Sequence, residues 1–492
     1  MSTPNPIHGL TRRQLVVGGL GLGASALLGG CTTGGPPAGP VPVPAPPTLG
    51  TPAVRATLRP GVATVDLGGV TARTWCYDGR VPGAQLRAKA GDVVQVRVRN
   101  GLPAETSVHW HGIRLHNAAD GVPGITQDPI AAGADYTYTF TAPDPGTYFF
   151  HPHSGVQIDR GLYAPLVVDD PSEPGAYDTE WVLVLDDWTD GVGRSPDDIL
   201  AAFKAEGGTV SRGMNHDMGG MGGMGRSPLG DVGDIAYPHY LINGRVPAAP
   251  LSLTAKPWQR ARIRIINAAA DSIFTVAVGG HRMTITHTDG YPVQPVGAQS
   301  LRIGMGERYD VTVKAGDGVF PVVAQAAGKS GYALAILRSA TGQLPRDPIP
   351  AELSAYPASA EVLQADPGVR LPQAEPQRTY DLVLSGSMAP YVWTINGATY
   401  DRAQPLTVQA GEPMRLRLSN MSMMTHPVHL HGHTFQIGPA GGAGARKDTL
   451  LLPPMARAEV DLAADNPGRW MLHCHNAYHA EAGMMTRLDY TT

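Results

Sequence analysis

The stretch of the chain with the clearest chemical meaning is residues 473–484. Here Cys474 is followed by an imidazole five residues later, at His479, and by a thioether ten residues later, at Met484. Soft sulfur, imidazole and a weak axial thioether are the ligands of a mononuclear blue copper centre. The spacing therefore predicts such a centre, with one more imidazole supplied from elsewhere in the chain.

Two histidines flank the cysteine, and they indicate a second metal site. Neighbouring side chains on a strand point to opposite faces. We therefore expect His473 and His475 on one face and Cys474 on the other. One strand would then serve two metal sites and join them by a short covalent path for electrons.

The chain holds four His-x-His pairs in two matching sets. They are His109/His111, His151/His153, His429/His431 and His473/His475. Imidazoles paired on one face of a strand converge on metal. A structural zinc site is closed by four ligands, whereas eight imidazoles beside a Cys/His/Met site suit several redox-active copper ions. Single histidines without ligand spacing are interpreted as structural or surface residues, namely His116, His239, His281, His287 and His433.

The composition favours many short strands as the elements that position these residues. The 492 residues include 61 Gly and 45 Pro, and only 16% are charged, which is typical of turn-rich β proteins. A net charge of -4 without a basic face argues against a nucleic-acid partner. Cys31, Cys76 and Cys474 each have a separate expected role, so no disulfide framework is predicted. We expect Cys76 to be a small buried hydrophobe.

A pattern of turn and strand recurs three times. Each Asp-Gly or Asn-Gly turn is followed, after a short gap, by an alternating strand with one buried and one solvated face. The turns lie at 77–82, 242–247 and 395–398, and the strands at 94–100, 261–265 and 414–420. We therefore predict an all-β fold of three consecutive Greek-key β-sandwich domains. Their expected limits are 51–172, 173–345 and 346–492.

The histidine pairs occur only in the first and third copies of this repeat. Residues 146–153 superpose on residues 468–475, with Pro152 at the place of Cys474. The corresponding middle segment, 318–325, has no histidine. The first and third domains are thus expected to meet around a shared metal cluster, with the middle domain as a spacer.

These motifs resemble those of three-domain multicopper oxidases. The resemblance rests on His109-Trp110-His111-Gly112, His151-Pro152-His153, His426 to Gly432 and residues 473–484, and it extends from about residue 55 to the C-terminus. It implies cupredoxin-like domains and four copper ions: one type 1, one type 2 and a type 3 pair, with the last three in a trinuclear cluster. Carried over by position, it implies His426, Cys474, His479 and Met484 for type 1; His109 and His429 for type 2; and His111, His151, His153, His431, His473 and His475 for type 3.

The implied activity is the oxidation of a one-electron donor coupled to the reduction of dioxygen to water, with Cys474 as the residue that delivers the electron. Asp120 matches an acidic residue near the cluster in this family. A carboxylate there is a usual proton donor, and a simple turn aspartate is the alternative. Many relatives have a glutamate directly after the histidine matching His479, but here Ala480 stands there and Glu481 follows. A solvated surface carboxylate is therefore favoured for Glu481.

The electron donor is indicated by methionines. Residues 214–224 form a low-complexity loop with four of them, Met214, Met218, Met221 and Met224. Thioethers favour Cu(I), so copper capture is preferred to a disordered loop without a role. In the cuprous oxidases of this family a methionine two residues before the type 1 histidine helps to bind substrate Cu(I), and Met424 matches it. Ser422 stands where an aspartate is typical, and Met421 or Met423 are alternatively core residues.

We therefore expect a monomeric multicopper oxidase that oxidises Cu(I) to the less membrane-permeant Cu(II), in a copper-tolerance role. A laccase acting on phenols and aromatic amines is the same-site alternative. A copper store without turnover is the alternative from another class. A simple electron carrier would need one blue site and no imidazole cluster, and a copper nitrite reductase has only two such domains.

The N-terminal residues indicate export. Residues 1–31 hold Arg12-Arg13 before an apolar run too short to span a membrane comfortably, which resembles a twin-arginine signal. Residues 28–31 resemble a lipobox, in which Cys31 would be lipidated, and an ordinary cleaved signal is the alternative. The proline-rich residues 32–50 are expected to be an extended tether that holds the folded body at the outer face of a membrane in the cell envelope.

Overall fold

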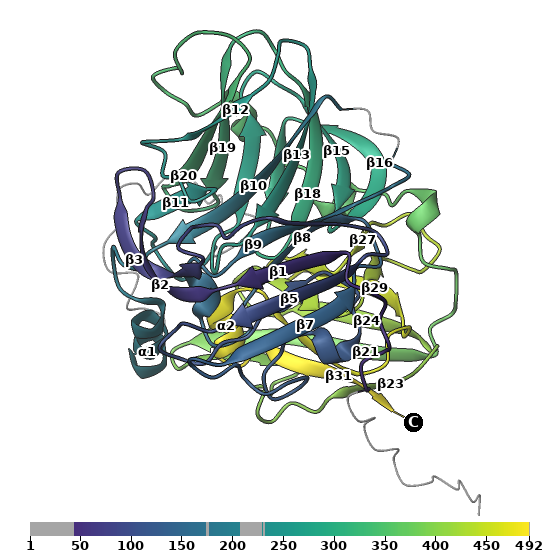
Figure 1. Ribbon diagram of the computed structural model, residues 1–492. Helices are drawn as coiled ribbons and strands as arrows, with labels where there is room; N and C mark the ends of the chain where they lie inside the picture. Colours follow the sequence, from purple (N-terminus) through teal and green to yellow (C-terminus); the bar gives the residue numbers. More distant parts are fainter. Residues whose placement is uncertain (1–43, 174–176, 207–228, 230–231, 492) are drawn as a thin grey trace, which may run out of the picture. The chain divides into compact units, whose positions relative to one another are not determined.

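The computed structural model describes residues 44–173, 177–206, 229 and 232–491. The predicted signal at 1–31 with Cys31, most of the tether at 32–50, and the methionines of residues 214–224 lie outside the described residues. The described chain is built mainly of strands (Figure 1). Its helices are all too short or too polar to cross a membrane.

The first group of strands lies between residues 54 and 169. It forms a four-stranded sheet in the order β4-β9-β8-β6, a three-stranded sheet β1-β5-β7, and the hairpin β2-β3. The bounds are β1 Val54–Leu58, β2 Pro60–Asp66, β3 Thr71–Tyr77, β4 Leu86–Lys89, β5 Val93–Arg99, β6 His109–His111, β7 Asp135–Thr141, β8 Gly146–His151 and β9 Ala164–Asp169.

The second group lies between residues 179 and 338. It pairs a six-stranded sheet, β11-β10-β13-β18-β15-β16, with a five-stranded one, β12-β20-β19-β14-β17. The bounds are β10 Thr179–Trp188, β11 His239–Ile242, β12 Leu251–Thr254, β13 Arg260–Asn267, β14 Phe274–Val278, β15 Met283–Thr288, β16 Tyr291–Ala298, β17 Ser300–Ile303, β18 Arg308–Lys314, β19 Val319–Ala326 and β20 Tyr332–Arg338.

The third group lies between residues 378 and 491 and repeats this plan. Its sheets are β22-β21-β24-β29-β26-β27 and β23-β31-β30-β25-β28. The bounds are β21 Arg378–Met388, β22 Tyr391–Ile395, β23 Leu406–Gln409, β24 Pro413–Asn420, β25 His426–Leu430, β26 Phe435–Ile437, β27 Arg446–Lys447, β28 Thr449–Leu452, β29 Arg457–Ala463, β30 Arg469–Cys474 and β31 Met485–Thr491. The α-helices within the described residues are α1, Pro196–Glu206, and α2, Ala477–Glu481.

The same strand order recurs in all three groups, and it confirms the predicted all-β repeat. In each, an early strand pairs in parallel with a later one, which pairs antiparallel with a third: β1-β5-β7, β10-β13-β18 and β21-β24-β29. Each predicted turn has both central residues in the left-handed region, as at Asn243 with φ 50° and Gly244 with φ 72°. This is the backbone of a type I′ hairpin turn, which Asn-Gly and Asp-Gly favour.

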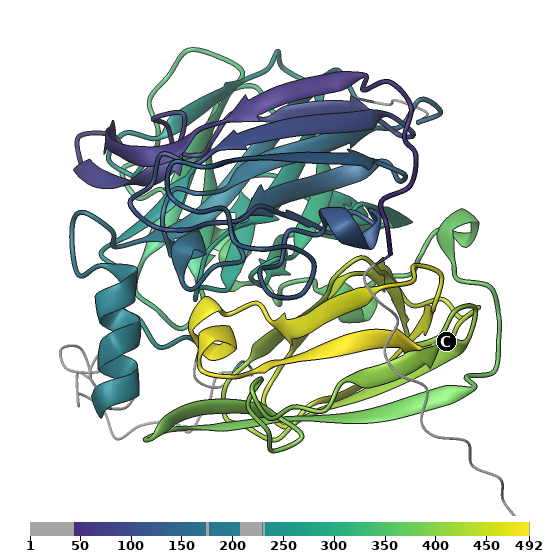
Figure 2. The same cartoon turned by 60° about the horizontal axis from the view of Figure 1, so that its bottom comes forward.

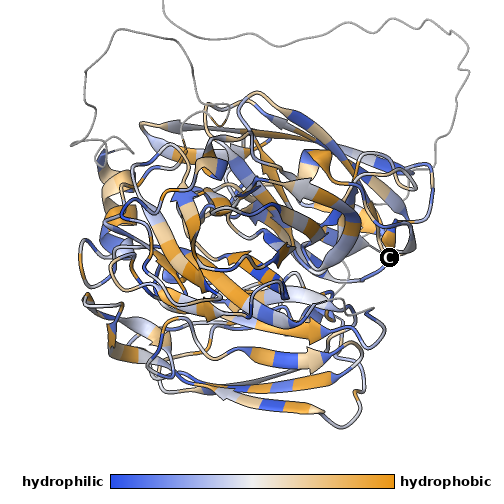
Figure 3. Ribbon diagram, turned by 90° about the horizontal axis from the view of Figure 1, so that it is seen from above, coloured by the Kyte–Doolittle hydropathy of each residue, from blue (hydrophilic) through white to orange (hydrophobic). Residues whose placement is uncertain are grey.

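Alternation of side chains explains how these strands make cores. In β5, Val94, Val96 and Val98 are completely buried, while Arg97 and Arg99 between and after them are exposed. Burying one face of each strand removes apolar area from water, which is the main stabilising contribution to such sandwiches. Figure 3 shows the resulting banding of hydrophobic and hydrophilic residues along the strands.

The first and third domains lie against each other. Figure 2 shows the third-domain strands, in yellow and green, facing the purple and blue strands of the first domain. Among the described residues Cys76 and Cys474 are both buried and free, so neither forms a disulfide.

Candidate metal centre

Two equivalent strand pairs carry the His-x-His motifs. In the first domain β6 pairs with β8, which sets His109 opposite His151. In the third domain β25 pairs with β30, which sets His429 opposite His473. Rings of the two domains stack on each other, His109 on His431 at 3.7 Å and His111 on His429 at 3.8 Å between centroids, so the imidazoles face one common centre.

The residues predicted for the blue site form one compact group in the third domain. The Sγ atom of Cys474 lies 3.6 Å from Nδ1 of His426 and 3.8 Å from Nδ1 of His479, and these two ring nitrogens are 3.1 Å apart. Met484 is completely buried, and its carbonyl accepts a 3.0 Å hydrogen bond from the Cys474 backbone N–H. One thiol and two imidazoles thus converge through one atom each.

Partners outside this group orient its two imidazoles. Nε2 of His479 lies 3.1 Å from a carboxylate oxygen of Asp234, and Nε2 of His426 lies 2.7 Å from the Ser422 hydroxyl. Such outer contacts fix the ring and the tautomer of a metal-binding histidine. Asp234 comes from the middle domain, 245 residues before His479, and no local sequence signal marks it.

The eight imidazoles of the His-x-His pairs form a second group, wholly buried except for His153. Within it, ring nitrogens converge in three sets: His109, His111 and His429; His111, His151 and His475; and His153, His431 and His473. The prediction that His473 and His475 face away from Cys474 agrees with these sets. His111 joins two of them, so the metal positions are adjacent.

Unpaired ring nitrogens test whether this group fits copper. Nε2 of His109, His153 and His429 and Nδ1 of His111 are buried without a hydrogen-bond partner. Elsewhere in the group Nε2 of His431 lies 3.0 Å from Nε2 of His473. Buried polar atoms are almost always paired, so lone pairs left without donors fit a metal. The residues present therefore fit copper ions.

The protonation of these rings is also suited to metal. Burial, followed by neighbouring imidazoles, lowers the pKa of six of them well below the ordinary value: His111, His151, His153, His431, His473 and His475. A neutral imidazole offers the lone pair that binds a metal ion.

Asp120, which the sequence singled out, lies beside this group. Its carboxylate oxygens are 3.2 Å from Nδ1 of His109 and 3.0 Å from Nδ1 of His431. Its carbonyl also accepts a 2.9 Å hydrogen bond from His109 Nδ1. Asp120 is buried and fixes one ring from the first domain and one from the third.

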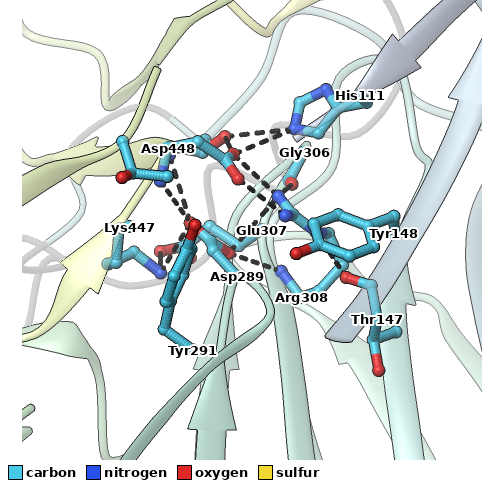
Figure 4. A network of polar contacts seen from close by, with 12 residues as sticks. His111, Thr147, Tyr148, Asp289, Tyr291, Gly306, Glu307, Arg308, Lys447 and Asp448 are labelled. Atoms are coloured by element: carbon cyan, nitrogen blue, oxygen red, sulfur yellow. Dashed lines mark hydrogen bonds and ion pairs between the residues drawn. The ribbon is translucent and has the colours of Figure 1, made fainter. Parts of the chain in front are cut away.

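A second carboxylate, Asp448, was not foreseen from the sequence. One of its oxygens lies 3.3 Å from His111 Nε2 and 3.3 Å from His429 Nδ1, and its carbonyl accepts from His429 Nδ1 at 2.9 Å. Burial alone would raise the pKa of Asp448, but the guanidinium of Arg308 holds that pKa well below its usual range. Figure 4 shows this carboxylate between His111 and Arg308.

Glu481 differs from the expected surface carboxylate. It is partly buried and lines a cavity of about 30 Å³, together with His473 and His475 of the third domain and His151 and His153 of the first. This volume suits about one water molecule. Burial raises the pKa of Glu481, with Lys204 opposing.

The methionines near His426 are divided by exposure. Met424 is buried, whereas Met421 is 51% exposed and Met423 46% exposed, so neither of these two is a core residue. The single histidines His116, His239, His281, His287 and His433 belong to none of the convergent groups found among the described residues.

Comparison with known proteins agrees with this geometry. Family models described as multicopper oxidase match residues 61–173, 180–342 and 373–492. Multicopper oxidase MmcO of Mycobacterium tuberculosis is 50% identical over 89% of this chain and 87% of its own length. A copper resistance protein A homolog of Pseudomonas syringae pv. tomato is 32% identical over 94% of this chain and 97% of its own length.

Solved structures share the fold. The multicopper oxidase Fet3p has a TM-score of 0.76 at 21% identity, covering 89% of this chain and 90% of that one. A laccase from Botrytis aclada has a TM-score of 0.73 at 25% identity, covering 88% and 87%. With the copper-compatible clusters and the family matches along most of its length, the chain belongs to the multicopper oxidases, copper-dependent oxidoreductases with three cupredoxin-like domains.

Proposed function

We propose that this protein is a cuprous oxidase, which oxidises Cu(I) with dioxygen and thereby confers copper tolerance. In this assignment His426, Cys474, His479 and Met484 hold the type 1 copper; His109 and His429 hold type 2; and His111, His151, His153, His431, His473 and His475 hold the type 3 pair. When bound, these four copper ions take electrons singly from a donor and deliver four of them to dioxygen.

Side chains of the protein provide the path for electrons and the candidate proton donors. Cys474 is joined through single peptide bonds to His473 and His475, so a continuous covalent path connects the two groups of ligands. Asp120 contacts rings of both domains and is our candidate for holding a proton near the cluster. Glu481 lines the small cavity beside the cluster and is a second candidate.

The observation that carries Cu(I) as the donor is a set of exposed thioethers next to the type 1 site. Met421 and Met423 precede His426, and Met455 is 59% exposed. Ser419 pairs with Arg457 in the β24–β29 register, and the Asn420 N–H bonds the Ala456 carbonyl at 3.0 Å. Met421 follows the end of β24 and Met455 precedes the start of β29, so both exposed thioethers lie where this strand pair ends. Exposed thioethers have no core to fill and are soft ligands for Cu(I).

Buried Met424 is the inner member of this proposed path, and the methionines of residues 214–224 are its outer members. The described residues at both ends of that segment contact the type 1 region. Phe203 of α1 packs against Tyr391 at 4.8 Å between ring centroids, and the Leu229 carbonyl accepts a 2.8 Å hydrogen bond from Thr425. These anchors support a role of Met214, Met218, Met221 and Met224 in supplying Cu(I).

Oxygen uptake with two donors tests the proposal. The copper-loaded protein receives Cu(I) or a methoxyphenol, alongside one variant with the four methionines of 214–224 changed to Ser and another with Met421→Ser and Met423→Ser. We expect rapid uptake with Cu(I) that falls in both variants, while phenol turnover stays unchanged. Phenol turnover without Cu(I) turnover would instead make the protein a laccase, which relatives such as Laccase-1 of Botryotinia fuckeliana, 29% identical, also suggest. Full copper loading without uptake would leave only copper storage.

We further propose that the protein is exported by the twin-arginine route and anchored to the outer face of the membrane through a lipid on Cys31, and that it is a monomer. Support comes from Arg12-Arg13 and from the residues preceding Cys31. A Cys31→Ala variant should move from the membrane fraction to the soluble fraction, and light scattering of that soluble form should give the mass of one chain. Unchanged membrane association would contradict the lipid anchor.

A further inference from the structure

The middle domain contributes a buried arginine to the junction beside the cluster. The guanidinium of Arg308, on β18, is completely buried and donates 2.7 Å and 2.6 Å hydrogen bonds to the two carboxylate oxygens of Asp448 in the third domain (Figure 4). Two further N–H groups donate to the carbonyls of Thr147 at 3.1 Å and Gly306 at 3.0 Å. Arg308 thus links all three domains.

Asp448, which Arg308 holds in place, contacts two of the cluster histidines. Its side chain lies between His111 and His429, and the Thr449 hydroxyl, which contacts both rings, donates a 2.8 Å hydrogen bond to it. A bidentate arginine–carboxylate pair fixes both the position and the orientation of the carboxylate. Arg308 therefore sets the orientation of the Asp448 carboxylate, which in turn contacts the His111 and His429 rings.

Close packing leaves no room for the Arg308–Asp448 pair to shift. A Cβ atom on Gly112, the residue after His111, would lie 2.3 Å from Arg308 Nη2. A Cβ atom on Gly306 would lie 2.9 Å from the His475 ring and 3.0 Å from the His111 ring. The middle-domain segment from Gly306 to Arg308 is therefore a wall of the cluster, whereas the sequence suggested only a spacer.

We propose that Arg308 is a positioning residue for the type 2 copper, acting through Asp448 on His429. The inference rests on the ligand assignment proposed above. In that assignment type 2 copper has two imidazole ligands, His109 and His429, while the type 3 pair shares six; in the structure His111 also converges with His109 and His429. The ion with fewest protein ligands depends most on the orientation of each. Loss of a residue that orients a metal ligand typically lowers metal affinity or activity by about 10- to 100-fold.

The test compares Arg308→Lys with Glu307→Gln. Lysine keeps the positive charge but cannot bind both oxygens at once. Glu307 is the adjacent, equally buried residue of the same junction, but it faces Lys447 at 3.1 Å and no predicted copper ligand. Copper per chain, the type 2 signal in electron paramagnetic resonance, the blue absorption and the thermal midpoint are measured for both.

A double variant, Arg308→Met with Asp448→Asn, removes both charges together, so that folding does not leave one of them unpaired.

We expect Arg308→Lys and the double variant to bind close to three copper ions per chain, to lose the type 2 signal and to keep the blue absorption. Glu307→Gln should keep all four ions even if its thermal midpoint falls. A full type 2 signal in the double variant would overturn the proposal, as would equal copper loss in Glu307→Gln. Failure of the wild-type protein to show a type 2 signal would instead contradict the ligand assignment itself.

Discussion

Cys474 is the only candidate ligand that carries a thiol. Burial raises the pKa of its thiol, so the buried thiolate is unfavourable unless a cation compensates it. The two imidazoles that converge on the sulfur bind a metal through a lone pair and, in that form, supply no such charge. The site therefore requires a metal ion to hold the residue in the thiolate form.

Replacement of this thiol should separate the two groups of ligands. In Cys474→Ser the blue absorption should vanish and oxygen uptake with any donor should stop, because a hydroxyl does not replace a thiolate as a soft ligand. The imidazole cluster should retain its copper. Cys76→Ser is the matched control, since Cys76 is the other buried free cysteine of the described chain and lies in the hairpin β2-β3. A blue Cys474→Ser protein would contradict the assignment.

Asp120 should act on the oxygen half of the reaction alone. In Asp120→Asn the contacts with His109 and His431 lose their charge, and we expect steady-state oxygen uptake to fall by about 10- to 100-fold. Reduction of the blue site by Cu(I) without oxygen should keep its wild-type rate, as followed by stopped-flow absorbance. Asp128→Asn, an exposed change nearby in the chain, serves as the control. Equal slowing of both half-reactions would argue against a role at the cluster.

At the scale of elements, the short helix α2 is what brings His479 back to Cys474. Its N-cap is Asn476, whose side-chain oxygen accepts hydrogen bonds from the N–H groups of Tyr478 and His479. Its amide donates to Asp271 of the middle domain at 2.7 Å. The cap therefore both starts the helix and ties it to the neighbouring domain.

Loss of this cap should disturb the blue site and not only stability. Asn476→Ala should lower the free energy of unfolding by about 1 kcal/mol, the usual cost of a lost N-cap. It should also shift the blue absorption, because His479 is one of the capped residues. Asp366→Ala removes the cap of a short helix at 367–369 distant in sequence from every ligand, and it should cost stability without a spectral shift. The same spectrum in both variants would contradict the positioning role of Asn476.

Much of the strand architecture was predictable because its signals are local. Alternation in β5 and β24 and the Asn-Gly or Asp-Gly turns are read within a few residues. Alternation also predicted a solvated face for β13, which is wrong, because Arg262 and Arg264 are buried in ion pairs with Asp310. The His-x-His pairs could be assigned to one cluster because period-2 spacing puts both rings on one face of a strand. The copy of these signals in the middle domain predicted its fold without any ligand.

The supporting residues could not be predicted, because their roles come from contacts between distant parts of the chain. Asp234 reaches His479 across 245 residues, and Arg308 reaches Asp448 across 140. Each is an ordinary charged residue in its local sequence. The prediction of a solvated surface carboxylate was wrong for Glu481, because Glu481 lies on the short helix α2 and lines the cavity beside the cluster.

At the scale of the whole molecule, one buried carboxylate joins all three domains. Asp159 of the first domain accepts hydrogen bonds from Tyr237 of the middle domain at 3.0 Å and Tyr478 of the third at 2.5 Å. Burial, followed by the charge of Asp187, raises the pKa of Asp159 well above its ordinary value. The folded protein therefore favours the protonated acid at this junction.

This shift predicts a pH-dependent stability cost. In the unfolded chain an aspartate loses its proton above about pH 4, while folded Asp159 keeps it to higher pH, so its contribution becomes more destabilising as pH rises from about 4 toward the folded pKa. Asp159→Asn cannot ionise and still offers an oxygen to both tyrosines. In the copper-free protein we expect the thermal midpoint of this variant to exceed that of wild type at pH 8 and the difference to shrink steadily toward pH 4.5.

Calorimetry across that pH range, with Asp128→Asn as the exposed control, checks this expected difference in thermal midpoint. A constant difference, or one that grows toward low pH, would mean that Asp159 is ionised in the folded protein and that the two tyrosines stabilise its charge.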